Sequence, residues 1–192
     1  MHVGEILITV LLLFAAVSSV GYALTIYNGL VSLKNNIARS WSNIDVILKQ
    51  RHDELPKLVN TCEGYMQHER AVFTQLGEAR AGLMKARTIP ERAQAESTLT
   101  QALGQFFAVA EAYPELKANQ NFLQLQNRIS ELENQIADRR EYYNDVVATF
   151  NTRLEQVPDK FIGDWCHFVS AELFKATDSD REDVRIEFKM SA

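Results

Sequence analysis

The sequence predicts an all-α protein with an N-terminal transmembrane helix, an antiparallel bundle of long helices, a short C-terminal helix and an extended tail. Three observations predict it. No charged residue occurs from Ile6 to Tyr27. Apolar residues then recur about every 3.5 residues over most of the remaining chain, which is typical of packed helices. The 192 residues include only 8 Gly and 4 Pro, too few for the many turns of an all-β fold.

The N-terminal segment, residues 1–27, is expected to be a retained membrane anchor. The uncharged run that includes Ile6, Leu12, Val20 and Tyr27 would extend about 33 Å as a helix, and a hydrocarbon core is about 30 Å thick. A cleaved signal peptide would carry Lys or Arg among its first residues, and the first five here contain neither. A buried core helix is usually shorter than this run.

The charges that flank this anchor predict its orientation. Glu5 is the only charged residue before the run, whereas Lys34 and Arg39 follow it closely. The positive-inside rule therefore places the N-terminus outside and the bulk of the chain in the cytoplasm.

Residues 28–86 carry two interleaved apolar series with heptad spacing. The first is Leu30, Ile37, Ile44, Arg51, Leu58, Tyr65, Val72 and Ala79, and the second is Lys34, Trp41, Leu48, Leu55, Cys62, Glu69, Leu76 and Leu83. The spacing keeps its phase across Pro56. Because an internal proline removes a hydrogen bond and kinks a helix, the pattern predicts one bent helix or two nearly collinear helices.

Two more amphipathic helices follow. Ile89-Pro90-Glu91 marks a helix start, because proline suits the first helical position and an acidic residue suits the first turn. Pro114 ends this second helix. Asn119 is a plausible cap for a third, which stops before Pro158. Short connections between amphipathic helices favour an antiparallel bundle, which we assign to residues 28–176.

The C-terminal region combines an aromatic segment with a tail. Residues 159–175 predict a short helix that packs on one end of the bundle or dips into the bilayer surface. In the tail, residues 177–192, Val184, Ile186, Phe188 and Met190 alternate with charged residues as in a strand. Such a strand is either disordered or adds to a partner. The candidate partner contacts of this region are Phe161, Trp165, Phe168, Phe174, Ile186 and Phe188.

Two segments resemble the signatures of the LemA family. They are YNGLVSLKNNIARSWSNIDVILKQRHDELPKLVNTCEGYMQHER, from Tyr27 to Arg70, and ALGQFFAVAEAYPELKANQNFLQLQNRISELENQIADRREYYNDVVATFNTRLEQVP, from Ala102 to Pro158. The likeness extends to about Phe188. It implies one membrane helix followed by an antiparallel bundle, in a bacterial inner membrane, without an established enzymatic activity. Some members of the family are linked to magnetosome membrane formation, and others occur beside membrane proteases or envelope-stress proteins.

Residue patterns do not point to catalysis. His68-Glu69 lacks the second histidine of HExxH, since Val72 stands in its place. No Glu is followed three residues later by His, as a di-iron bundle requires. The two cysteines form no CxxC, and Cys62 lies on an apolar series, which favours a buried free thiol. We expect no enzyme activity, metal or cofactor. A net charge of -5 also speaks against a nucleic-acid partner.

Charged residues interrupt the apolar series at a few positions. Arg51, Glu69, Arg139 and Arg153 lie there, and with Trp41 they are the candidate assembly or register residues. One alternative is that their stems are buried while the charged heads reach water. The other is that they fix helix register or face another subunit.

Two functions follow as expectations. The first is a membrane-anchored scaffold that forms homo-oligomers, contacts membrane lipid, and organises or shapes the membrane. The second is an adaptor or regulatory partner of another membrane protein, such as a protease or an envelope-stress factor.

Overall fold

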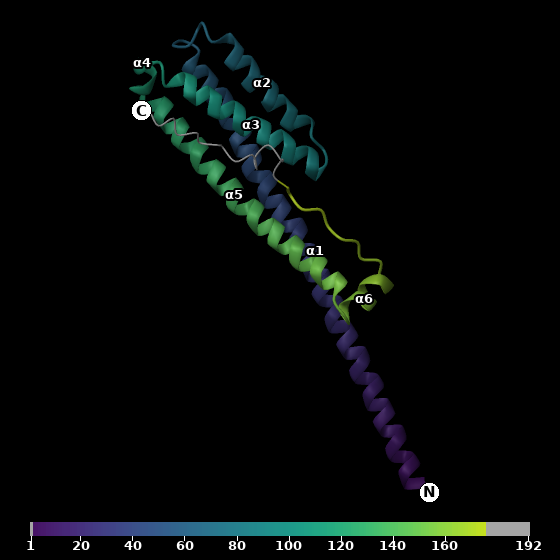
Figure 1. Ribbon diagram of the computed structural model, residues 1–192. Helices are drawn as coiled ribbons and strands as arrows, with labels where there is room; N and C mark the ends of the chain where they lie inside the picture. Colours follow the sequence, from purple (N-terminus) through teal and green to yellow (C-terminus); the bar gives the residue numbers. More distant parts are fainter. Residues whose placement is uncertain (1, 176–192) are drawn as a thin grey trace, which may run out of the picture. The chain divides into compact units, whose positions relative to one another are not determined.

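A computed structural model describes residues 2–175, and within that range every element is a helix (Figure 1). The helices are α1 (His2–Cys62), α2 (Arg70–Lys85), α3 (Ile89–Ala110), α4 (Pro114–Lys117), α5 (Gln120–Glu155) and α6 (Asp159–Trp165). The predicted all-α class, with a long apolar N-terminal helix and a helical bundle, is confirmed. The strand-like tail with Ile186 and Phe188 lies outside the described residues.

The helices form two compact units. The first comprises residues 2–45 and 138–173, and the second comprises residues 46–137 with Phe174 and Lys175. Helices α1 and α5 each contribute a segment to both units, while α2, α3 and α4 belong to the second unit and α6 to the first.

The first unit contains the apolar start of α1. The large apolar side chains between Val3 and Leu24 are all more than half exposed, and this helix is long and apolar enough to cross a membrane. Burial begins at Ile26 and Leu30, which form a core with Phe150 of α5. Part of α6 and of the segment after it, including Ile162 and Phe168, packs against this core.

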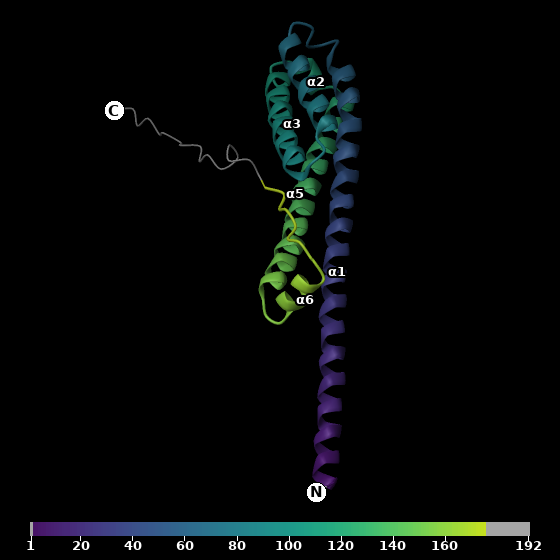
Figure 2. The same cartoon turned by 90° about the vertical axis from the view of Figure 1, so that its right-hand side faces the viewer.

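The second unit is a four-helix bundle built from the end of α1, α2, α3 and the start of α5, which run alternately in opposite directions (Figure 2). Its core contains apolar residues from all four helices, among them Leu58, Leu76, Leu103, Phe106 and Ile129. The amphipathic faces predicted from the heptad series are thus buried against one another within this unit.

The chain reverses between α1 and α2, which the heptad series did not predict. Helix α1 continues through Pro56 and ends at Cys62, and turns occupy much of the stretch before α2 begins at Arg70. The expected collinear continuation was therefore wrong. The intervening stretch has the length of one heptad, so the apolar spacing keeps its phase from Cys62 to Leu76 although the chain changes direction. Gly64, amid polar residues, was the local signal for a turn.

The starts of α3 and α5 follow local capping chemistry, and the predictions of both are confirmed. At the start of α3, the Thr88 hydroxyl accepts a hydrogen bond from Glu91 N while the Glu91 carboxylate accepts one from Thr88 N. At the start of α5, Asn119 Oδ1 accepts hydrogen bonds from the amides of Asn121 and Phe122, at 2.9 and 3.2 Å.

Candidate functional site

A charged cluster lies inside the second unit, where the residue pattern alone would place apolar side chains. The Arg51 side chain from α1 is fully buried. Its Nη2 lies 2.5 Å from Oε2 of Glu96 on α3. Its Nη1 donates to the Thr100 hydroxyl at 3.2 Å and lies 3.7 Å from Oε1 of Glu133 on α5. One guanidinium thus connects three helices, and a change in their relative register would break at least one of these contacts.

Burial makes this cluster electrostatically demanding. Glu96 is 2% exposed, so Arg51 and Glu96 hold opposite charges where water cannot solvate them. Desolvation raises the pKa of the Glu133 carboxyl above its usual value, and the positive charge of Arg51 partly opposes that rise. Within the described residues, Nε of Arg51 has no hydrogen-bond acceptor. The cluster therefore favours one arrangement of the three helices. The cost of burying its charges reduces its net contribution to the stability of the fold.

Glu69 lies just before α2, where it joins two chain reversals of the same unit. The Tyr113 hydroxyl donates a hydrogen bond to Glu69 Oε1 at 2.9 Å, and this bond is the main reason that the pKa of Tyr113 is raised. Nearby, Asn119 Nδ2 donates to the Tyr65 hydroxyl at 3.2 Å. These bonds tie the stretch between α1 and α2 to the connections that flank α4.

The remaining candidate register residues lie in the first unit. Arg153 Nε is 2.5 Å from Oδ2 of Asp159, and the guanidinium packs against Gly29, where a Cβ atom would lie 2.7 Å from Nη1. Trp41 packs on Tyr143, with ring centroids 5.7 Å apart. Arg139 is exposed.

The aromatic segment divides into inward and outward side chains. Helix α6 ends in a Schellman motif, in which Phe168 N donates to Gly163 O at 3.0 Å and His167 N donates to Asp164 O at 3.3 Å. His167 takes the left-handed conformation that this motif requires, with φ 57°. The reversal directs Phe168 onto the core ring of Phe150, at a centroid distance of 6.2 Å.

The outward side chains of this segment are Phe161 and Trp165, which are 65% and 85% exposed. Of the other candidate contact residues, Phe168 is half-buried and Phe174 is buried. Phe161 and Trp165 are therefore the aromatic pair in this stretch whose side chains are available to a partner.

The extended segment that follows α6 is tied to α5. Asn151 Nδ2 donates to Ala171 O at 2.9 Å, and Asn151 Oδ1 accepts from Ala171 N at 2.8 Å. The Tyr143 hydroxyl donates to Glu172 O at 2.9 Å. These three bonds satisfy backbone groups of a segment that has no regular secondary structure of its own.

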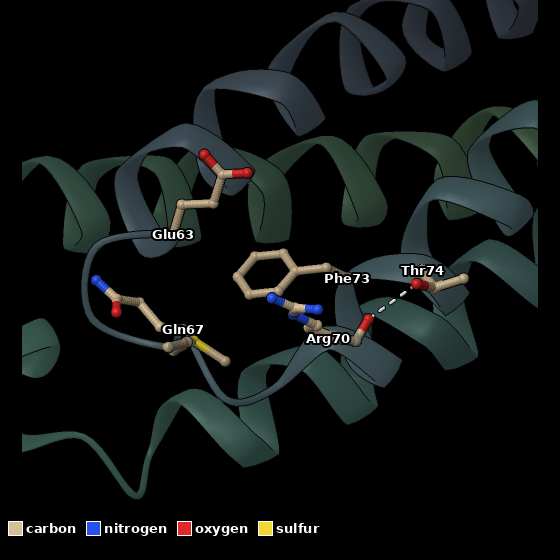
Figure 3. A pocket seen from close by; sticks show the side chains of 6 residues that line it. Glu63, Gln67, Arg70, Phe73 and Thr74 are labelled. Atoms are coloured by element: carbon tan, nitrogen blue, oxygen red, sulfur yellow. Dashed lines mark hydrogen bonds between the residues drawn. The ribbon is translucent and has the colours of Figure 1, made fainter.

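An open cavity of about 520 Å³ lies where α1 gives way to α2 (Figure 3). It is lined by Glu63, Met66, Gln67, Arg70, Phe73 and Thr74. The Thr74 hydroxyl donates to Arg70 O, so its proton is shared with a backbone carbonyl and not with a general base. The lining combines one acidic and one basic side chain, Glu63 and Arg70, with uncharged residues.

Other reactive groups are dispersed. The described residues contain no cluster of three His, Cys, Asp or Glu side chains that could hold a metal ion. Both cysteines are free: Cys62 is buried, and Cys166 is exposed. Burial raises the pKa of the Cys62 thiol to about 12, which keeps it in the unreactive neutral form near pH 7.

Glu96, Thr100 and Glu133, the partners of Arg51, were not among the candidate site residues predicted from the sequence. Glu96 shares a helix face with Leu99 and Leu103, so its charge on an apolar face was a usable signal. Asn151, which binds the extended segment, carried no comparable signal, because its partner is a backbone group.

Comparison with known proteins supports the architecture described above. The family model of the LemA family matches residues 40–188. Magnetosome protein MamQ 2 of Paramagnetospirillum magneticum is 23% identical over 194 residues, which cover 86% of this chain and 71% of that protein. Protein LemA of Metamycoplasma hominis is 25% identical over 160 residues, covering 82% and 72%, respectively. Magnetosome protein MamQ of Magnetospirillum gryphiswaldense is 21% identical over 196 residues, covering 87% and 72%. Because the family match includes most of the chain, this protein belongs to the LemA family.

Proposed function

We propose that this protein is a non-enzymatic, membrane-anchored scaffold whose copies assemble laterally and organise or shape the membrane. In this proposal the anchor crosses a bacterial inner membrane with the N-terminus outside, and the second unit is cytoplasmic. The family and the apolar helix together indicate a membrane-associated protein. Lateral assembly, topology and the choice of membrane are the parts that we add.

The observation that carries the proposal is the exposed start of α1. Its large apolar side chains from Val3 to Leu24 are 57–73% exposed in the described chain. Moving one such side chain out of water is worth about 1.5–3 kcal/mol, so a series of them strongly favours a lipid environment. The first buried position, Ile26, comes near the end of the predicted anchor, residues 1–27.

Confinement to a membrane makes weak contacts between copies sufficient for assembly. An anchor limits each copy to a plane and raises its effective concentration toward its neighbours. Exposed apolar side chains on the helices offer such contacts, and they include Val46, Met84, Leu123 and Tyr142. Arg51, Glu69 and Arg153 have partners within their own unit, so we assign them to helix register. Exposed Arg139 is the charged candidate for a contact between copies.

The test uses the full-length chain, labelled with one fluorophore and reconstituted in proteoliposomes over a range of protein densities. The expected result is several photobleaching steps per spot, in numbers that rise with density. Arg139→Ala and Met84→Glu should lower the step number. Gln101→Glu, another exposed position, is the matched control and should leave it unchanged. One step per spot at every density would refute the scaffold.

Crosslinking in intact cells distinguishes the second candidate function. The scaffold predicts that adducts between two copies of this chain dominate. A dominant adduct with one foreign membrane protein, together with one photobleaching step per spot, would replace the scaffold by an adaptor.

A further inference from the structure

Four apolar side chains around α6 are solvent-exposed at a spacing of four residues. They are Val157, Phe161, Trp165 and Val169, and their exposed fractions lie between 65% and 85%. Phe161 and Trp165 share one face of α6, because residues four apart on a helix lie on the same side. Exposed aromatic side chains this close together are costly in water and mark a contact surface.

Contacts within the first unit fix where this surface lies along α1. On the other side of α6, Ile162 packs with the core around Ile26 and Leu30. Phe168 packs edge-on against Tyr27, with ring centroids 6.0 Å apart. Lys34 Nζ lies 5.9 Å from the centroid of the Phe168 ring. The segment is therefore held beside α1 between Tyr27, the last residue of the predicted anchor, and Lys34, the first charged residue after that anchor.

Figures 1 and 2 show the same placement from two directions: α6 lies beside α1 where the uncovered part of α1 meets the end of α5. If residues 6–27 cross the hydrocarbon core, this level is the headgroup zone. That zone is about 5–8 Å deep on each side of the bilayer, and Tyr27 and Lys34 are about 10 Å apart along the helix.

We propose that Phe161 and Trp165 insert into the headgroup region of the leaflet from which α1 emerges, so that the protein contacts the membrane at a second point besides its anchor. Tryptophan prefers this region because its ring is apolar and its N–H can hydrogen-bond. The proposal rests on the anchoring part of the proposed function and adds a lipid-binding surface to it.

Charge around α6 indicates which property of the lipid matters. Arg153 pairs with Asp159, and Lys160 Nζ lies 3.5 Å from Asp164 Oδ2. Since these cations have acidic neighbours in the same segment, attraction to anionic lipid is weak and the aromatic side chains supply the contact. We therefore expect the insertion to be equal in zwitterionic and anionic membranes.

The two tryptophans of the chain provide an internal comparison. Trp41 packs on Tyr143 in the same unit, 14 residues beyond Tyr27 on α1, which places it about 21 Å farther along the helix. Full-length Trp41→Phe, which retains Trp165, and Trp165→Phe, which retains Trp41, are reconstituted in vesicles of phosphatidylcholine with lipids brominated near the headgroup. A second series contains phosphatidylglycerol. Flotation after an alkaline wash first isolates the inserted protein, so failed anchoring is detected separately.

Insertion predicts strong bromine quenching of Trp165 in both lipid series, little quenching of Trp41, and loss of most Trp165 quenching in Phe161→Ser. An unquenched Trp165 in floated vesicles overturns the proposal. If its emission is then as red as that of free tryptophan, the surface faces water. If its emission is blue-shifted, a second copy of the chain covers it. Equal quenching of both tryptophans also overturns the proposal, because α6 would then have no special position.

Discussion

Replacing Arg51 by alanine tests whether the buried cluster holds the helices of the second unit together. The substitution leaves Glu96, 2% exposed, without the guanidinium that lies 2.5 Å from its carboxylate. Removing one partner of a buried ion pair costs about 3–5 kcal/mol, because the remaining buried charge loses that partner. For a chain of this size, each kcal/mol lowers the melting temperature by about 2–4 °C, so the expected decrease is about 6–20 °C.

The assay is thermal and urea unfolding of the full-length protein in mild detergent, followed by far-ultraviolet circular dichroism. Amide hydrogen exchange in α3, around Glu96, assigns the loss of stability to the second unit. Lys49→Ala is the matched control, because it removes an exposed cation two residues from Arg51 on the same helix, and it should change stability by less than about 0.5 kcal/mol.

A double variant separates helix register from net stability. Arg51→Met with Glu96→Leu replaces both charges by apolar groups, and such exchanges are often neutral or stabilising by about 1–4 kcal/mol. We expect it to recover the stability that Arg51→Ala loses. Two results would contradict this reasoning. Either Arg51→Ala has the same melting temperature as the wild type, or the double variant is as unstable as the single one. In the second case the loss of the ion-pair partner of a buried charge would not be the cause of the instability.

Three further predictions concern ionisation, thiol reactivity and close packing. Because the pKa of the Glu133 carboxyl is raised, the folded protein still binds a proton at a pH at which the unfolded chain has already lost it. The free energy of unfolding should therefore fall as the pH rises from about 4.5 to the raised pKa. Glu133→Gln should remove this part of the pH dependence in urea unfolding measured over a pH series, and an identical slope in both proteins would contradict the reasoning. Maleimide should label Cys166 and leave buried Cys62 unlabelled until urea unfolds the chain. Mass spectrometry measures this labelling, and native protein labelled at both cysteines would contradict the prediction. Gly29→Ala should displace the Arg153 guanidinium, because the new Cβ would lie 2.7 Å from its Nη1, and this displacement should offset most of the roughly 1 kcal/mol that alanine gains over glycine inside a helix. A urea midpoint raised by that full amount would show that the guanidinium moves aside without cost.

Helix boundaries were predictable where one or two residues determine them. Thr88 with Glu91 and the Asn119 side chain act on backbone groups within three residues of themselves, so the sequence contains the whole interaction. The reversal after Cys62 was not predictable from the apolar spacing, because a connection of one heptad in length is invisible to a heptad pattern. Gly64 was a weaker signal than the unbroken spacing.

The charged cluster and the aromatic surface needed the structure for a different reason. The sequence marks Arg51 as unusual, and its partners Glu96 and Glu133 are known only once α1, α3 and α5 are placed beside one another. Similarly, composition marks residues 159–175 as aromatic. Which side chains face outward depends on the packing of Ile162 against the core, and the reversal at His167, where a residue other than glycine adopts a positive φ, turns Phe168 inward.

The pairing of Asn151 with Ala171 has a consequence for how the segment after α6 can detach. Both hydrogen bonds belong to one amide side chain, so a single rotation of that side chain breaks them together. At Ala171 the segment is therefore bound to Asn151 either through both hydrogen bonds or through neither. A change that favours another Asn151 rotamer would therefore remove two of the three hydrogen bonds that tie the segment to α5 and leave the bond from Tyr143 to Glu172 O.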